Sequence, residues 1–194
     1  MNNIHHSYYI PSAIDEDVAN IIKKQCSGNL DLFESEITMT EDNHTKQVNN
    51  MKIRNSQVGW IPTDSWISGM MKHFVEVANN NLFHYDLNQW ASHIQFTYYN
   101  GKGSHYGWHN DLWDSYFDDD NVRKLSISLL LSDCSEYEGG ELQLMYMGDN
   151  QMLTTKPPIG SAIIFPSMTR HRVRPLKSGE RISLVGWYGG PPFR

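Results

Sequence analysis

From about residue 90 onward, the chain alternates short apolar, β-rich segments with clusters of turn residues, and this alternation restricts its fold more than any other feature. The turn clusters include Asn100-Gly101-Lys102-Gly103 and Glu138-Gly139-Gly140. Because no helical pattern lies between the apolar segments, they predict a sandwich or barrel rather than a parallel sheet with crossover helices. We expect strands over residues 94–99, 124–131, 141–147, 161–165, 171–174 and 181–188.

The first 89 residues are helical in pattern, with loops between the helices. Ser12 or Asp15 can cap a first helix that ends near residue 28, and Asp64 or Ser65 can cap a second over residues 66–78. Short strands are expected around residues 37–40 and 51–58. We therefore predict one mainly β domain over residues 1–194, with residues 1–89 as helical support packed on one sheet of a jelly roll formed by residues 90–190.

Composition excludes several classes of protein. No apolar run approaches the roughly 20 residues of a membrane-spanning helix, and the first residues lack the pattern of a signal peptide. Cys26 and Cys134 are the only cysteines, which favours reduced thiols and a cytoplasmic location. The net charge of −6 argues against a nucleic-acid partner.

Two imidazoles and one carboxylate occur at spacings that suit a metal ion. His109 and Asp111 are alternate residues, so on a strand both side chains point to the same side. His171 begins a later predicted strand, whereas the other histidines lack a partner at ligand spacing. Three such ligands leave coordination positions open, and this is typical of non-heme Fe(II) in oxygenases. A zinc hydrolase remains an alternative, because Zn²⁺ accepts the same ligands.

Arg181 follows His171 by ten residues and suggests that an open metal position is filled by a chelating dicarboxylate. Its planar guanidinium can bind both oxygens of a carboxylate at once. We expect Arg181 to lie across a hairpin from His171, facing the same side. Ser183 and Trp187 share the parity of Arg181 and are expected on that face.

The segment over residues 98–111 resembles the metal-binding strand of prolyl 4-hydroxylase-like, 2-oxoglutarate- and Fe(II)-dependent dioxygenases. Tyr99 and Tyr106 stand ten and three residues before His109, as in that family. Residues 123–142, 158–167 and 171–181 are similar to its later blocks, in the same order. The most similar branch is the bacterial and phage one that is iron-uptake-factor-like.

This resemblance implies a double-stranded β-helix, a cupin-like jelly roll, with Fe(II), 2-oxoglutarate and O₂ as metal and cosubstrates and ascorbate as a further cofactor. It implies His109, Asp111 and His171 as iron ligands, with no other catalytic group. Arg181 would bind the distal carboxylate of 2-oxoglutarate, and Tyr99, Ser183 and Trp187 would line its pocket. One departure is Leu129-Leu130-Leu131, where some members carry a tyrosine that also binds this carboxylate, so Ser183 or Tyr99 would supply a second donor.

The resemblance further implies hydroxylation of an unactivated C–H bond, with a prolyl or other protein side chain as the first substrate class. A free amino acid or small metabolite is the alternative, and a non-catalytic, cupin-like metal-binding protein is an alternative of another class. We expect Tyr106, Trp108 and Trp113 to contact substrate. The acidic, aromatic segment over residues 112–120 either closes over substrate as a lid or is a solvated connection.

Overall fold

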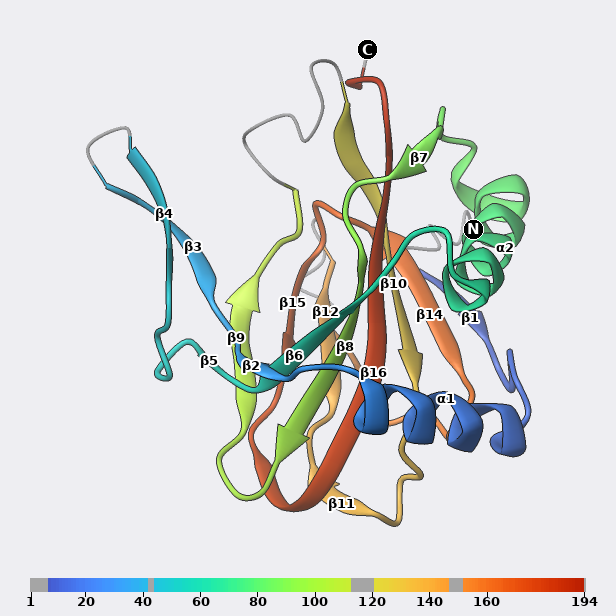
Figure 1. Ribbon diagram of the computed structural model, residues 1–194. Coiled ribbons are helices and arrows are strands. Elements are labelled where there is room, and N and C mark those ends of the chain that lie inside the picture. The colour runs from blue at the N-terminus through green and yellow to red at the C-terminus, as the bar shows by residue number, and fades with distance from the viewer. Residues whose placement is uncertain (1–6, 42–43, 113–120, 147–151, 194) are drawn as a thin grey trace.

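Two antiparallel β-sheets lie face to face in the computed structural model, which describes residues 7–41, 44–112, 121–146 and 152–193 (Figure 1). The larger, nine-stranded sheet has the order β1 (Tyr8–Ile10), β14 (Ala162–Pro166), β10 (Val122–Leu130), β16 (Leu176–Gly190), β8 (Ile94–Asn100), β6 (Gln57–Ile61) and β2 (Phe33–Glu34). Two short strands, β7 (Gln89–Trp90) and β11 (Tyr137–Gly139), also pair with β16. The smaller sheet has the order β13 (Met152–Thr155), β12 (Leu142–Met145), β15 (Arg170–Val173), β9 (His105–His109) and β5 (Arg54–Asn55). The predicted mainly β jelly roll is confirmed.

Both predicted helices form and pack on the nine-stranded sheet. Helix α1 spans Glu16–Asn29, with Asp15 at its N-cap position. Helix α2 spans Trp66–Ala78 and continues into a π-helical turn at Asn79–Phe83. Its N-cap residue Ser65 accepts a hydrogen bond from the backbone N–H of Ser68, which satisfies one of the free donors at the helix start. The buried stripe of each helix joins one core with the strands beneath it, including Ile22, Met71, Ile127 and Leu184.

The segment before residue 90 supplies strands to both sheets as well as the two helices, and strands form where short ones were predicted, around residues 37–40 and 51–58. β1, β2 and β6 extend the nine-stranded sheet, and β5 pairs with β9 in the smaller one. Strands of two to five residues depend on a partner backbone supplied by distant sequence, and a local pattern does not reveal that partner. A further hairpin, β3 (Ile37–Glu41) and β4 (His44–Val48), extends away from the two sheets (Figure 1).

The two faces of the nine-stranded sheet differ in chemistry. On the helix side, β10 presents Leu125 and Ile127, and these residues belong to the apolar core. The alternate residue Ser126 and, on β8, Gln95 and Thr97 point into the space between the sheets, where all three are buried. A buried sheet face that carries a few convergent polar groups is typical of a binding cavity rather than of a packed core.

His171 and Arg181 lie on different sheets, so the predicted hairpin between them is wrong. His171 on β15 pairs with His109 in the smaller sheet, whereas Arg181 on β16 pairs with Tyr99 in the larger one. The chain crosses between the sheets near Pro175, which lacks a backbone N–H and cannot continue a ladder of hydrogen bonds. The two side chains therefore face a common interior from opposite sheets.

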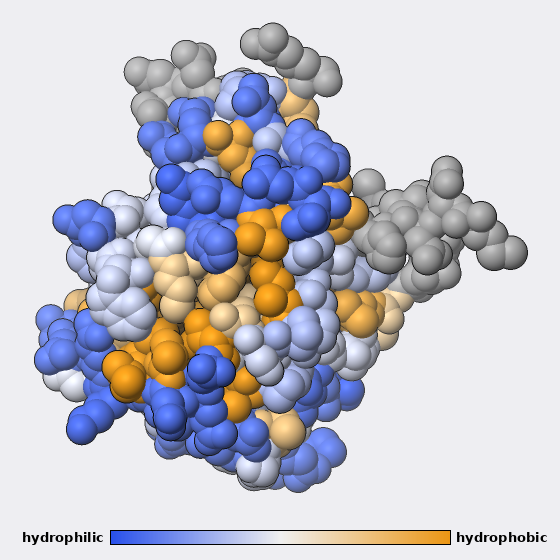
Figure 2. Space-filling view, turned by 90° about the vertical axis from the view of Figure 1, so that its right-hand side faces the viewer, coloured by the Kyte–Doolittle hydropathy of each residue, from blue (hydrophilic) through white to orange (hydrophobic). Residues whose placement is uncertain are grey.

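Figure 2 shows the side of the molecule to the right of Figure 1, where α1, α2 and β1 lie. Hydrophobic surface appears in the middle of this view, between hydrophilic stretches above and below. Partly buried residues such as Ile10, Val18 and Met70 pack against the core beneath the helices. No helix in the described part of the chain has the length and apolar character needed to cross a bilayer.

Candidate metal centre and its pocket

His109, Asp111 and His171 come together at one end of the space between the sheets. The two histidines are cross-strand partners on β9 and β15, and Asp111 follows β9 directly. One donor atom from each residue lies within 4.8 Å of the other two. Nε2 of His109 is 3.7 Å from Asp111 Oδ1, and Nε2 of His171 is 3.4 Å from Asp111 Oδ2. Donors bound at roughly 2.1 Å to one ion at right angles are separated by roughly 3 Å, so modest closure completes the site.

Backbone carbonyls orient both imidazoles toward the centre. Nδ1 of His109 lies 2.8 Å from the carbonyl oxygen of Gly107, and Nδ1 of His171 lies 2.9 Å from that of Thr169. Because a carbonyl oxygen only accepts, each Nδ1 carries the hydrogen and each Nε2 offers its lone pair to a metal. Burial, together with the nearby His171, lowers the pKa of His109 to about 3, so its imidazole is neutral at physiological pH.

Asp111 is buried and held in place by two serines. The hydroxyl of Ser126 on β10 donates to Asp111 Oδ2 at 2.8 Å, and the backbone N–H of Asp111 donates to the carbonyl oxygen of Ser167 at 2.8 Å. Burial opposes ionisation of this carboxyl group, but His171, His109, Arg123 and the Ser126 hydroxyl outweigh it and lower the pKa of Asp111. The carboxylate is therefore ionised and correctly oriented as a ligand.

A β-bulge before His109 determines which aromatic side chains face the metal ligands. The register shifts between Tyr106 and His109, so both side chains face the interior, and their rings stack with centroids 3.5 Å apart. Trp108 does not share that face, since its ring contacts the guanidinium of Arg172 at 4.6 Å on the outer face of the smaller sheet. Of the two predicted substrate contacts within the described residues, the structure thus brings Tyr106, but not Trp108, to the metal ligands. Trp113 and residues 114–120 of the predicted lid lie outside the described residues.

Arg181 faces the metal ligands across the interior and is only 3% exposed. Its Nη1 donates to Ser183 Oγ at 3.2 Å, and its Cζ lies 5.5 Å from the ring centroid of Tyr99. Among the described residues no carboxylate forms an ion pair with Arg181, and its Nε has no hydrogen-bond partner. Nε1 of the buried Trp187 also lacks a partner among them. A buried cation and two unpaired N–H donors suit an anionic ligand that carries carboxylate oxygens.

Sequence reasoning missed three residues that line or border this interior. Arg123 on β10 stacks on the Trp187 ring at 4.3 Å and acts electrostatically on Asp111. Arg54 on β5 lies 4.5 Å from the Tyr106 ring centroid. Tyr137 on β11 interacts with Arg181. Each reaches the site through tertiary pairing, so no local spacing in the sequence marks it.

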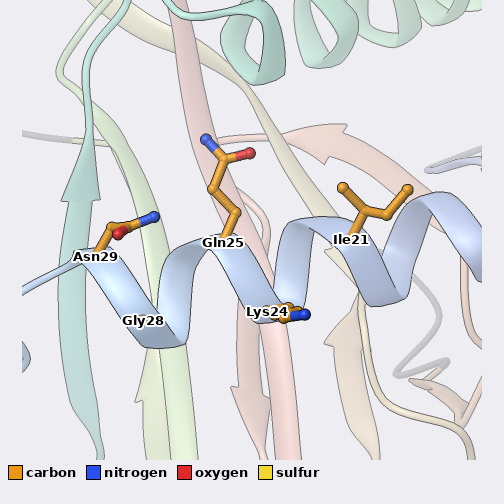
Figure 3. A pocket seen from close by; sticks show the side chains of 5 residues that line it. All are labelled: Ile21, Lys24, Gln25, Gly28 and Asn29. Atoms are coloured by element: carbon orange, nitrogen blue, oxygen red, sulfur yellow. The ribbon is translucent and has the colours of Figure 1, made fainter.

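A separate concavity lies on the exposed side of α1 and is lined by Ile21, Lys24, Gln25, Gly28 and Asn29 (Figure 3). It contains no imidazole, carboxylate or thiol. The only group of three or more potential metal ligands within the described residues is the one formed by His109, Asp111 and His171. The interior between the sheets is therefore the candidate active site.

A double-sheet jelly roll with a His-Asp-His set and an opposing buried arginine defines the class of non-heme iron oxygenases that use a 2-oxo acid. The family model of the 2OG-Fe(II) oxygenase superfamily matches residues 94–189. The chain belongs to this superfamily, and its fold is similar to that of prolyl 4-hydroxylases. Membership implies Fe(II), 2-oxoglutarate and O₂ as metal and cosubstrates, and the His-Asp-His set and the buried Arg181, whose Nε has no partner among the described residues, suit them.

Individual relatives and structures agree with this assignment. A PKHD-type hydroxylase of Synechococcus sp. strain CC9902 is 41% identical over 85 residues, which cover 44% of this chain and 36% of the relative. One from Hyphomonas neptunium is 41% identical over 88 residues, or 45% of this chain and 38% of the relative. The match thus spans little more than a third of these curated relatives. In fold, the chain is similar to a Pseudomonas putida prolyl-4-hydroxylase, with a TM-score of 0.69, 22% identity, and coverage of 95% of this chain and 92% of that one.

Proposed function

We propose that this protein is an Fe(II)- and 2-oxoglutarate-dependent dioxygenase that hydroxylates an unactivated C–H bond. The observation that carries the proposal is the guanidinium of Arg181, which is buried opposite the three candidate metal ligands without a carboxylate partner among the described residues. A metal-binding protein without catalytic activity has no need for a buried cation that binds the distal carboxylate of a dicarboxylic ligand. A zinc hydrolase has none either, since its reaction uses metal-bound water.

The residues on the two sheets would have different roles, one set binding the metal and the other binding the cosubstrate. His109, Asp111 and His171 would hold Fe(II) on one side and leave its other positions open. Arg181 would bind the distal carboxylate of 2-oxoglutarate and so direct its 2-oxo acid end toward the metal. Bound together, these groups would supply the oxidative decarboxylation of 2-oxoglutarate by O₂, in which one oxygen atom enters succinate, CO₂ is released and the other oxygen atom enters the substrate C–H bond.

The pocket walls would keep this chemistry away from bulk water. Tyr99 and Trp187 are buried on the inward face of the nine-stranded sheet, as Arg181 is, and Ser183 accepts a hydrogen bond from the guanidinium. A dry pocket strengthens the charge–carboxylate interaction, because the local dielectric constant is low. The proposal assigns no separate proton-transfer role to the described residues, because hydrogen abstraction from carbon needs none.

For the substrate we propose a prolyl or other side chain of a peptide. A structural neighbour from Trichoplax adhaerens, at 20% identity, is a prolyl hydroxylase in complex with a peptide fragment of hypoxia inducible factor. The interior here offers the aromatic ring of Tyr106 beside His109, with Arg54 close to it. A free amino acid is the smaller substrate to be compared. We place the protein in the cytoplasm, in keeping with two free cysteines, and ascorbate remains a predicted additional cofactor.

The proposal is tested by measuring succinate release from 2-oxoglutarate with Fe(II) and O₂, across panels of proline-containing peptides and free amino acids. We expect stimulation by at least one peptide and loss of all turnover in Asp111→Ala. Stimulation only by free amino acids would replace the peptide substrate. Turnover that persists in Asp111→Ala would overturn the metal site.

A further inference from the structure

The distal end of the proposed cosubstrate pocket contains a second hydroxyl group that the sequence did not predict. Tyr137 on β11 is buried in the apolar cluster between the two sheets, together with Tyr99 and Leu176. Burial raises the pKa of Tyr137, while the charge of Arg181 and a side-chain hydrogen bond with Arg181 act in the opposite direction. The phenol and the guanidinium are thus neighbours.

Glycine packing shows independently that these two side chains lie side by side. A Cβ atom at Gly140 would lie 3.1 Å from Cε2 of Tyr137 and 3.2 Å from Cδ of Arg181. Both side chains therefore rest against the same glycine, whose φ of +66° is also one that side-chain-bearing residues rarely adopt. Any larger residue at position 140 would push the phenol or the guanidinium out of place.

The direction of hydrogen bonding leaves the phenolic hydrogen of Tyr137 available. A guanidinium only donates, so beside Arg181 the Tyr137 oxygen can only accept, and the phenolic hydrogen points elsewhere. Among the described residues, no acceptor for this hydrogen is found. Nε of Arg181 lacks an acceptor as well. Two adjacent donors that both lack an acceptor are what a single carboxylate, with two oxygens, would satisfy.

Lys156 fixes the position of Tyr137. Its ammonium group donates to the carbonyl oxygens of Tyr137 at 2.6 Å and Cys134 at 2.8 Å, and it lies 4.2 Å from the Tyr137 ring centroid. A cation over an aromatic face is attracted by the π electrons of the ring. Lys156 thereby holds the Tyr137 side chain in place beside Arg181.

On β10 of the larger sheet, leucines stand where some members of the family carry a tyrosine that binds the distal carboxylate. Its inward residue there is Leu130, the cross-strand partner of Ser183 and almost fully buried. A leucine cannot donate a hydrogen bond. Tyr99 contacts Arg181 through its ring, with 5.5 Å from the ring centroid to Cζ. The hydroxyl of Tyr137 is therefore the phenol best placed to join Arg181.

We propose that Tyr137, positioned by Lys156, donates the second hydrogen bond to the distal carboxylate of 2-oxoglutarate and so contributes to selection of a dicarboxylic 2-oxo acid. This inference rests on the proposed function. It assigns to β11 the role that the sequence had suggested for Ser183 or Tyr99. Tyr137 is a cosubstrate-binding residue in this account, and Lys156 is a positioning residue.

Two 2-oxo acids that differ only at the distal end test the proposal. 2-Oxovalerate carries a methyl group where 2-oxoglutarate carries its distal carboxylate. Binding of each acid to the metal-loaded chain is measured by calorimetry without oxygen. In Tyr137→Phe we expect the dissociation constant of 2-oxoglutarate to rise about tenfold or more, as for loss of a hydrogen bond to a charged group. The constant of 2-oxovalerate should stay the same.

The matched control is Tyr188→Phe. Tyr188 is also buried, and its hydroxyl donates to the carbonyl oxygen of Asn88 at 3.3 Å, but it faces the helices rather than the pocket. This variant should bind both acids as the wild type does. Lys156→Met should also weaken the binding of 2-oxoglutarate and not that of 2-oxovalerate, but by less than Tyr137→Phe does. In turnover, its KM for 2-oxoglutarate should rise while kcat stays unchanged.

Either of two results would overturn the role of Tyr137. One is unchanged affinity of Tyr137→Phe for 2-oxoglutarate, and the other is an equal loss for both acids, which indicates a role in folding alone. Binding of 2-oxoglutarate by the wild-type chain keeps these results separate from failure of the proposed function. A wild-type chain that bound neither acid would overturn that function, and this inference with it.

Discussion

Replacing Arg181 with methionine should stabilise the ligand-free protein and remove its response to 2-oxoglutarate. The guanidinium is 3% exposed, and within the described chain no carboxylate pairs with it. A buried charge without a counterion lowers stability, and its removal by a residue of similar length is neutral or favourable. Ser183 and the nearby aromatic rings offset part of that cost. We expect the free energy of unfolding to rise by roughly 1–3 kcal/mol.

Thermal unfolding with and without cosubstrate measures both effects. One kcal/mol corresponds to about 2–4 °C in Tm for a chain of this size. With bound metal and 2-oxoglutarate at 100 times its dissociation constant, the wild type should gain about 2.7 kcal/mol. Arg181→Met should gain nothing. Arg174→Met is the control, since Arg174 is half-exposed and 3.7 Å from Glu141, and it should shift neither curve by more than about 1 °C.

The two expected effects of Arg181→Met have opposite signs: the ligand-free protein becomes more stable, and the stabilisation by 2-oxoglutarate is lost. A variant that is less stable than the wild type without ligand would show that Arg181 serves the fold. A variant that still gains stability from 2-oxoglutarate would show that the carboxylate binds elsewhere. Either result would refute the assignment of Arg181 as a carboxylate receptor.

Three further predictions concern other parts of the structure. Ser126→Ala removes the hydroxyl that orients Asp111 and should weaken Mn²⁺ binding about tenfold in calorimetry; unchanged affinity would contradict that orienting role. Trp108→Ala should leave 2-oxoglutarate affinity unchanged in the same assay, because Trp108 stacks on Arg172 outside the pocket; a marked loss would place Trp108 in the site. Ser65→Ala should lower the free energy of unfolding by about 1 kcal/mol in urea titrations, and no change would mean that the cap of α2 contributes nothing.

Local signals in the sequence predicted the elements that local interactions form. The cap at Ser65 and the apolar stripe after it predicted α2, and a similar pattern predicted α1. The spacing of His109 and Asp111 predicted two ligands on one side of a strand, and their donor atoms do lie close together. These features depend on residues within a few positions of one another, so the sequence alone reveals them.

Features that depend on distant pairing were missed or misplaced. Arg181 was predicted as a pocket residue, but on a hairpin with His171, because parity along the chain does not show that the strand crosses to the other sheet. Arg54 and Arg123 approach the site from β5 and β10. Tyr137 reaches Arg181 because β11 pairs with β16. Only the three-dimensional arrangement reveals these neighbours.

Anaerobic titration of the Fe(II)-loaded chain with 2-oxoglutarate, followed by visible absorption, tests the central claim most directly. Chelation of Fe(II) by a 2-oxo acid gives a weak charge-transfer band that neither component shows alone. We predict that this band appears and saturates with one equivalent in the wild type, and that it is absent in Asp111→Ala. A folded, iron-loaded wild-type chain that gave no such band would contradict the claim.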